Sequence, residues 1–396
     1  GTMADPNQRI HVSGFLKLYL WILRAICYYY QEPGEPLWYI VYSAVTMFLY
    51  VVAPAILNLI KIIKCLIAER DPEILARGFT NVTYTSEVYC FLVQKNNITQ
   101  VFNDMDSDIF QPRNEFQRAI IRRQMLKAKR FIDISMWVTC ALCFLYGIKP
   151  RIRNDTSLPM NVWYPVDTSK SPAYWVVYVY EYIFMMLHAC SHVSLASIPI
   201  LSMAFLIGQL NMIADTLRKL KEYAEEDAKT DNKKDNTVKT HVEMKKLLIQ
   251  CVYKHRALRR LVIALNKVYT YHFLMILSNA IIGFALLLYQ LSTEGLQSII
   301  TATFHIATLM TQLLLYNWYG NEVTFKSDTL YIAAYSMDWP GTPVWFQKDL
   351  LFALIHFQIP MKIYACNFFL LCLESYVGVL RTSWSYFLLL TNMNEE

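Results

Sequence analysis

The stretch SYVGVLRTSWSYFLLLTNM, residues 375–393, decides the fold, because it has the length of a membrane-spanning helix but carries polar side chains that lipid disfavours. At 100° per residue, its polar side chains gather on two adjacent helix faces. One face comprises Ser375, Thr382, Tyr386, Leu389 and Met393, and the other comprises Glu374, Gly378, Arg381, Ser385 and Asn392. The sequence therefore predicts a membrane helix with a polar stripe along one side.

A polar stripe inside a bilayer is stable only against water, another polar surface or a copy of itself. One helix cannot enclose a channel, so this pattern favours several subunits that bring their final helices to a shared axis. Leu389 and Met393, near the outer end, would then form an apolar constriction. In the alternative interpretation, Glu374 and Arg381 pair with neighbouring helices of a single bundle and line no pore.

Composition places the whole chain in a membrane. Hydrophobic residues make up 55% of it and charged residues only 17%, which is far from a soluble domain and indicates an all-α, polytopic membrane protein. The net charge of +6 comes largely from two loops between apolar segments. We therefore expect membrane lipid, and no nucleic acid, as the partner of these charges.

Seven transmembrane helices are predicted from apolar segments of about 20 residues or more. Six are clear, near residues 36–60, 131–148, 173–208, 261–291, 296–319 and 363–391. A weaker one, near 72–95, contains Thr83, Thr85 and Glu87 and suits a helix packed inside a bundle.

Lysine and arginine set the expected orientation. Residues 95–130 hold eight of them and residues 211–260 hold thirteen, whereas residues 149–172 hold four. The rich loops are predicted to be cytoplasmic, which places the N-terminus in the cytoplasm and the C-terminus, after seven spans, outside the cell. A sequon at Asn154 then falls in an outer loop.

The remaining segments complete the expected organisation. Phe15–Tyr30 is predicted to lie at the membrane interface, and Glu225–Thr240 to be a mobile connection. Met244–Val262 is a basic amphipathic helix, read as part of a cytoplasmic bundle in preference to a calmodulin target. A short helix is expected at Lys348–Phe357, before Pro360.

The predicted units are 1–35 (cytoplasmic N-terminus), 36–208 (four transmembrane helices with the ligand site), 209–260 (cytoplasmic loop), 261–325 (two transmembrane helices), 326–360 (cytoplasmic subunit contacts) and 361–396 (final helix).

No enzymatic pattern stands out. His188 and His192 lie four residues apart with Cys190 between them, but a third ligand at metal-site spacing is missing, so we expect no metal. Cys140 and Cys143 have redox spacing but lie within an apolar span. There is no phosphate-binding glycine loop and no catalytic triad, so we expect neither an enzyme nor a cofactor.

Two stretches resemble a known family. MKIYACNFFLLCLESYVGVLRTSWSYFLLL, residues 361–390, resembles the last helix of insect odorant receptors, and YGNEVTFKSDTLYIAAYSMDWP, residues 319–340, matches the cytoplasmic end of that family's sixth helix. One departure is Asn367, where the family usually has lysine. The ending around Ser385 and Tyr386 departs from the related gustatory receptors, although a gustatory-type channel remains an alternative.

The resemblance implies an odorant-gated, non-selective cation channel in the plasma membrane of sensory neuron dendrites. The channel would be a heterotetramer of this subunit with co-receptor subunits, because the chain lacks the long insertion of the co-receptor itself. Its gate would lie at Leu389, with Asn392 and Met393 just beyond, and Thr382 and Tyr386 would face the pore. A metabotropic receptor or a transporter without a central pore is the other alternative.

The resemblance also implies a ligand pocket in the outer half of the bundle. Residues available there are Tyr84, Val88, Phe144, Tyr146, Tyr178, Tyr182, Phe304 and His305. Such a wall would suit a small volatile ligand, and its aromatic content favours an aromatic one. Packing between helices and the aromatic belt at the membrane interface explain any single one of these residues equally well.

Overall fold

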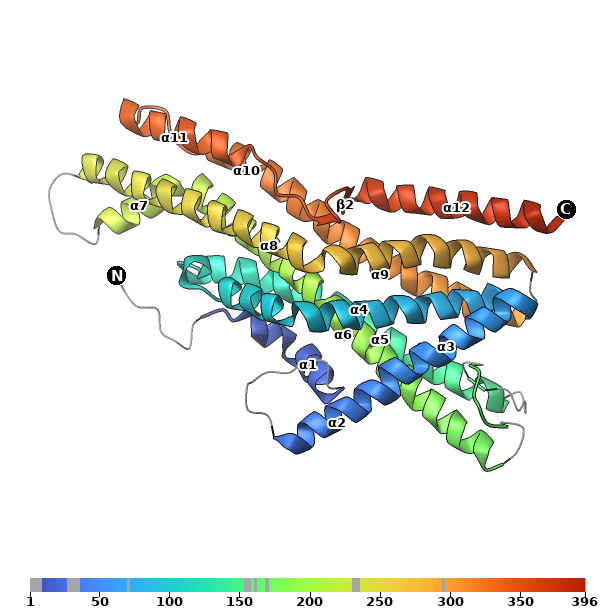
Figure 1. Ribbon diagram of the computed structural model, residues 1–396. Helices are drawn as coiled ribbons and strands as arrows, with labels where there is room; N and C mark the ends of the chain where they lie inside the picture. The colour runs from blue at the N-terminus through green and yellow to red at the C-terminus, as the bar shows by residue number, and fades with distance from the viewer. Residues whose placement is uncertain are drawn as a thin grey trace.

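The computed structural model describes residues 9–26, 36–69, 72–152, 158–159, 162–167, 171–229, 236–293 and 296–395. Within these ranges, long helices lie side by side in an elongated bundle (Figure 1). The all-α prediction is confirmed for the described residues, apart from one short hairpin. The sequon at Asn154 lies outside them.

The first half of the chain contributes the helices α1 (Val12–Ala25), α2 (Leu37–Met47), α3 (Ala53–Lys64), α4 (Pro72–Met105) and α5 (Glu115–Ile152). A π-helical turn, η2 (Phe48–Val52), joins α2 to α3, a second one, η3 (Cys65–Glu69), follows α3, and a 3₁₀ turn, η4 (Asp108–Phe110), precedes α5. The turn η2 lies just before Pro54, whose missing N–H disturbs the regular helical hydrogen bonds. Residues 37–69 therefore continue as one helical rod through the proline.

The second half contributes α6 (Ala173–Arg218), α7 (Leu220–Lys229), α8 (Asn236–Thr293), α9 (Leu296–Asp328), α10 (Leu330–Tyr335), α11 (Val344–Phe357), β1 (Tyr364–Ala365), β2 (Phe369–Leu370) and α12 (Leu373–Glu395). Figure 1 shows α7, α10 and α11 at one end of the bundle, while α12 runs toward the opposite end along its periphery. We call the end with α7, α10 and α11 the basic end, because the lysine-rich and arginine-rich residues 113–130, 211–229 and 236–260 belong to it.

Helix α6 forms the buried axis of the bundle. Every side chain from Val193 to Leu210 is buried. The hydroxyls of Ser194 and Ser202 donate to carbonyls of their own helix, at 2.7 and 2.8 Å, so they need no partner elsewhere. A methyl group on Gly208 would lie 3.3 Å from the Cα atom of Ile121, so glycine lets α5 pack closely against α6.

Three helical stretches among the described residues are long and apolar enough to cross a membrane by composition alone, namely Leu37–Ile67, Ala173–Arg218 and Thr237–Ser292. They include three of the seven predicted spans. The predicted weak span falls in α4, which buries Thr83 and Glu87 inside the bundle as expected. A helix whose polar residues face its neighbours does not need an apolar average.

Helix α1 lies where the sequence predicts an interfacial helix, but it begins at Val12 and ends at Ala25. Its buried face comprises Val12, Leu16, Tyr19 and Leu23. The Tyr19 hydroxyl donates to Asp133 Oδ1 of α5 at 2.6 Å. Helix α1 is therefore anchored to the bundle by packing and by a hydrogen bond.

The mobile connection predicted at Glu225–Thr240 is wrong at both of its ends. Helix α7 continues to Lys229, and α8 begins at Asn236, so only residues 230–235 lie outside the described helices. The side chains of Ala228 and Met244, on either side of this gap, are buried, and α7 packs against α8. Tertiary packing therefore extends helices into a segment whose composition favours a loop.

The prediction that the final helix begins near residue 363 is also wrong. Residues 364–370 form an antiparallel hairpin, β1 and β2, and α12 begins only at Leu373. Cys366 and Asn367 both have positive φ, at 49° and 60°, which makes a turn that a helix cannot contain. Asn266 of α8 fixes the hairpin, because its side chain donates to the Lys362 carbonyl at 2.9 Å and accepts the Tyr364 N–H at 3.1 Å.

Candidate ligand site and the exposed face of the final helix

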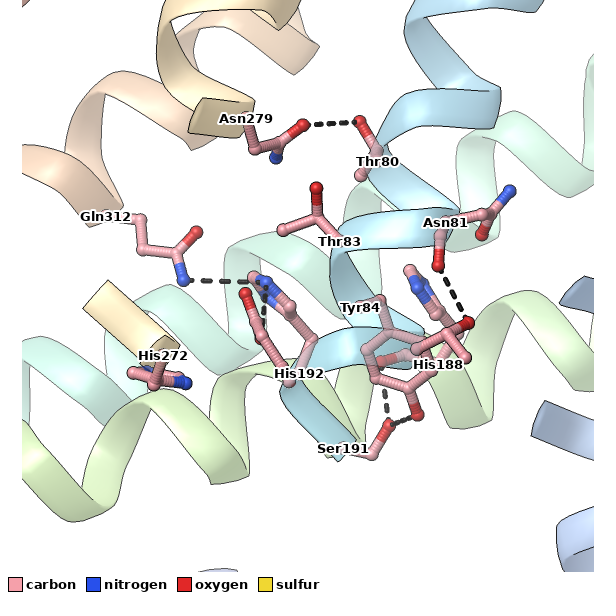
Figure 2. A network of polar contacts seen from close by, with 12 residues as sticks. Thr80, Asn81, Thr83, Tyr84, His188, Ser191, His192, His272, Asn279 and Gln312 are labelled. Atoms are coloured by element: carbon pink, nitrogen blue, oxygen red, sulfur yellow. Dashed lines mark hydrogen bonds and ion pairs between the residues drawn. The ribbon is translucent and has the colours of Figure 1, made fainter. Parts of the chain in front are cut away.

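A buried polar cluster lies where α4, α6, α8 and α9 meet (Figure 2). Figure 2 labels Thr80, Thr83 and Tyr84 of α4, His188, Ser191 and His192 of α6, His272 and Asn279 of α8, and Gln312 of α9. We define the cluster by these residues together with Glu87 of α4, which contacts His192, and Tyr316 of α9, which contacts His272. Polar side chains are costly at this depth unless they bind one another or a ligand. Their hydrogen bonds therefore indicate which groups remain available.

Tyr84 is the central contact between α4 and α6. Its hydroxyl lies 2.5 Å from Ser191 Oγ, and Ser191 Oγ also lies 2.9 Å from the His188 carbonyl oxygen. Because the serine donates its single proton to that carbonyl, the tyrosine donates to the serine. The Tyr84 ring meets the His188 ring edge-on, with centroids 4.0 Å apart. In contrast, His188 Nε2 is buried and has no hydrogen-bond partner in the described structure.

Glu87 places a carboxyl group in the same cluster, with its side chain only 1% exposed. Its Oε2 atom lies 3.5 Å from His192 Nε2, and the Gln312 side chain lies 3.5 Å from the same nitrogen. On the neighbouring helices, His272 Nε2 lies 3.1 Å from the Tyr316 hydroxyl. The cluster thus links four helices that are distant in sequence.

The structure brings only part of the predicted ligand site together. Tyr84 and Val88 are buried in the bundle, at 3% and 1% exposure. Tyr178 donates to the Gly147 carbonyl, and a methyl group on Gly147 would collide with the Tyr182 ring, so both tyrosines serve the contact between α6 and α5.

The other predicted positions lie nearer the surface or outside the description. Phe144 and Phe304 are about half exposed, at 51% and 47%, and His305 is partly buried. The side chain of Tyr146 lies outside the described residues.

Sequence reasoning did not identify most of the cluster as a candidate ligand site. It considered His188 and His192 only as half of a metal site, and it considered Glu87 only as a sign of burial. The signal that could have found them is spacing, because His188, Ser191 and His192 share one face of α6, and Tyr84 and Glu87 share one face of α4. Two polar faces on apolar helices indicate a shared polar contact.

Helix α12 buries one side and exposes the other. Val379 and Ser383 are buried at 3% and 1% exposure, against α8 and α9. The exposed side carries Arg381, Thr382, Ser385, Tyr386, Leu389 and Asn392. Four predicted pore positions, Thr382, Tyr386, Leu389 and Asn392, are therefore exposed on the single chain, while the side chain of Met393 lies outside the described residues.

Comparison with known proteins identifies relatives over most of the chain. The family model described as 7tm Odorant receptor matches residues 78–384. Odorant receptor 10 of Aedes albopictus is 22% identical over 326 residues, which cover 80% of this chain and 84% of that protein. Odorant receptor Or2 of Anopheles gambiae is 24% identical over 343 residues, which cover 85% of this chain and 89% of that protein.

Solved structures share the fold. The olfactory receptor OR5 of Machilis hrabei in complex with eugenol superimposes with a TM-score of 0.79 at 17% identity, over 97% of this chain and 99% of that one. The same receptor described without eugenol gives a TM-score of 0.76 at 18% identity, over 96% and 98% of the two chains. Since the family model covers well over half of the sequence, this chain belongs to the insect odorant receptor family of multi-pass membrane proteins.

Proposed function

We propose that this chain is the ligand-binding subunit of an odorant-gated, non-selective cation channel, which it forms as a heterotetramer with co-receptor subunits. The observation that carries the proposal is the exposed polar side of α12, with Arg381, Ser385 and Asn392 at its centre. A membrane helix that packs polar residues away from its own bundle needs water or another chain on that side. A central pore supplies both.

The gate is proposed at Leu389, whose side chain is 54% exposed on the same side of α12 as Thr382. Four such leucines around an axis would make a narrow apolar ring that excludes water and ions. Asn392 and Met393 follow toward the outer end, and Tyr386 precedes the ring by about one turn.

The ligand is proposed to be a small volatile molecule that contacts the buried polar cluster. The unpartnered His188 Nε2 and the nearby Tyr84 hydroxyl offer hydrogen bonds, and Val88 adds apolar contact. This chemistry suits an aromatic ring that carries a hydroxyl or carbonyl oxygen. Eugenol, which binds the structurally similar OR5, is therefore a sensible first compound to test.

Contacts between subunits are proposed at the basic end. Leu351, Phe352 and Ile355 of α11 are 56–63% exposed, although apolar side chains of this size normally lie inside. Burial of this face against other subunits would hold the tetramer together while the transmembrane helices remain free to move.

The test is current through excised patches of plasma membrane that contain this chain and a co-receptor, recorded without nucleotide or G protein. A panel of phenols and aromatic aldehydes that includes eugenol should open a cation conductance. Leu389→Ser should change its rectification and block. Val377→Ser, a similar change on an apolar face of the same helix, should leave both unchanged.

Two outcomes would count against the proposal. A current that needs a G protein would favour a metabotropic receptor. A current whose rectification and block are the same in Leu389→Ser and in the unmodified channel would show that α12 does not line the pore.

A further inference from the structure

Helix α5 carries unpaired cations on its outer face at the basic end. Arg122, Arg123, Lys127 and Arg130 are all exposed, and in the described part of the chain none of them contacts an acidic side chain. Two other cations of the same helix are paired, because Arg118 contacts Glu115 and Lys129 contacts Asp133. Arg113, which lies just before the helix, contacts Asp227. The absence of acids is therefore a property of one face of α5.

The same face becomes apolar within one turn. Phe131, Ile134 and Trp137 are 46%, 59% and 78% exposed. A first groove of about 720 Å³ spans this change, lined by the four cations together with Ala119, Leu126, Phe131 and Ile134. Proteins place basic side chains next to exposed apolar ones where they cross the membrane surface, because the basic groups contact lipid headgroups and the apolar groups contact acyl chains.

A second groove of about 780 Å³ adjoins the first between α5, α6, α9 and α10. It shares Arg123 and Lys127 with the first groove and adds Arg218, which also lacks an acidic partner in the described chain. Its one acidic residue, Asp215, is already bound, by Lys219 Nζ at 3.4 Å and by the Tyr223 hydroxyl at 2.9 Å. The walls of this groove therefore carry a net positive charge.

We propose that the two grooves together form a binding site for an anionic phospholipid with several headgroup phosphates, a phosphoinositide. The phosphates bind Arg123, Lys127 and Arg218 in the second groove, and an acyl chain lies along Phe131 and Ile134 in the first. Charge complementarity carries this assignment, because five cations without acids converge on one concave surface that continues into an apolar one. The bias of lysine and arginine toward the cytoplasm explains their number but does not require them to share a groove.

The test uses the full-length receptor in phosphatidylcholine nanodiscs. Dioctanoyl phosphatidylinositol 4,5-bisphosphate is titrated in, and bound lipid is counted by native mass spectrometry. The double variant Arg123→Gln with Lys127→Gln should weaken lipid binding roughly 30-fold, because each of the two basic residues usually contributes a similar share of the affinity for an anionic lipid. The charge-conserving double variant Arg123→Lys with Lys127→Arg should retain most of the affinity for the lipid.

The control pair, Lys221→Gln with Lys246→Gln, removes the same charge from exposed lysines that already contact acids, and should bind like the unmodified receptor. Monodisperse elution of every variant shows that it has folded. The proposal is overturned if dioctanoyl phosphatidylserine binds as tightly as the phosphoinositide, or if both charge-removing pairs weaken binding equally. It is also overturned if soluble inositol trisphosphate binds as tightly as the lipid, because the apolar groove would then contribute nothing.

Discussion

The contact between Glu87 and His192 makes a sharp prediction about stability. Glu87 Oε2 lies 3.5 Å from His192 Nε2, the carboxyl group is almost fully buried, and neither of its oxygens has a hydrogen bond that would replace the histidine. His192→Gln removes the positive partner and leaves the carboxylate among apolar helices. We expect this change to destabilise the receptor strongly and Glu87→Gln to destabilise it much less, because a neutral amide can remain beside a neutral imidazole.

The magnitude follows from the burial of the pair. Removal of one member of a buried ion pair costs about 3 to 5 kcal/mol, whereas replacement of both by neutral groups is often close to neutral. For a chain of 396 residues, 1 kcal/mol corresponds to a change in Tm of about 1.2 °C, from the average entropy of unfolding per residue. His192→Gln should therefore lower the Tm by about 4 to 6 °C, and the double variant Glu87→Gln with His192→Gln should recover most of that loss.

The assay is thermal unfolding of the purified receptor in detergent, followed by size-exclusion chromatography of the fraction that stays monodisperse. His356→Gln, at a partly exposed histidine on α11 that contacts no acidic side chain in the described part of the chain, serves as the control and should change the Tm by less than about 1 °C. If the double variant is as unstable as His192→Gln alone, the two side chains do not interact energetically. Glu87 and His192 would then not form a stabilising ion pair in the cluster.

Four further predictions concern other parts of the chain. Leu389→Ser should leave the Tm within about 1 °C of the unmodified value, because the side chain is exposed, yet raise the current without odorant. Asn367→Val should cost about 1 to 2 kcal/mol at its φ of 60°, while Asn367→Gly should be close to neutral by thermal unfolding. Gly320→Ala places a methyl group 2.6 Å from the Leu371 carbonyl oxygen, so it should shift the odorant dose–response curve more than Gly378→Ala, which meets no atom within 4 Å. Burial lowers the pKa of His255 from 6.5 to about 4. As the pH drops from about 6.5 toward 4, the unfolded chain therefore binds a proton at this histidine before the folded chain does, so the Tm should fall. A Tm that falls equally in His255→Gln would contradict this.

The sequence predicts the helices well because their signal is local. Apolar stretches of sufficient length, the polar stripe of residues 375–393 and the stop at Pro360 all depend on neighbouring residues, and the structure has helices at each of the seven predicted spans. The hairpin before α12 was missed because its cause lies elsewhere in the chain. Asn266 and Thr270 of α8 hold it, and both are almost 100 residues away in sequence.

The candidate ligand site was harder to predict for the same reason, because it depends on contacts between distant parts of the chain. Tyr84 and Val88 were selected from the zone that the family resemblance implies, and the polar residues of their helix predict that it packs inside the bundle, where both side chains are buried. Phe144 and Phe304 were selected by type, yet an aromatic residue in an apolar span has no local feature that separates an inward from an outward position. Their exposure follows from how α5 and α9 are rotated in the bundle, which depends on contacts such as that between Gly147 and Tyr182.

One side of α9 connects the buried polar cluster to the final helix. Gln312 contacts His192, Tyr316 contacts His272 four residues later, and Gly320 meets the backbone of Leu371 after four more, two residues before α12 begins. Residues four apart lie on one helix face, so a ligand that moves Gln312 or Tyr316 would turn or shift the same face that supports the start of α12. Because Gly320 leaves no space for a methyl group, such a shift cannot be absorbed by a loose contact there. On the proposed function, α9 is therefore the helix through which an odorant at the cluster would act on the pore, and the larger effect expected for Gly320→Ala follows from that position.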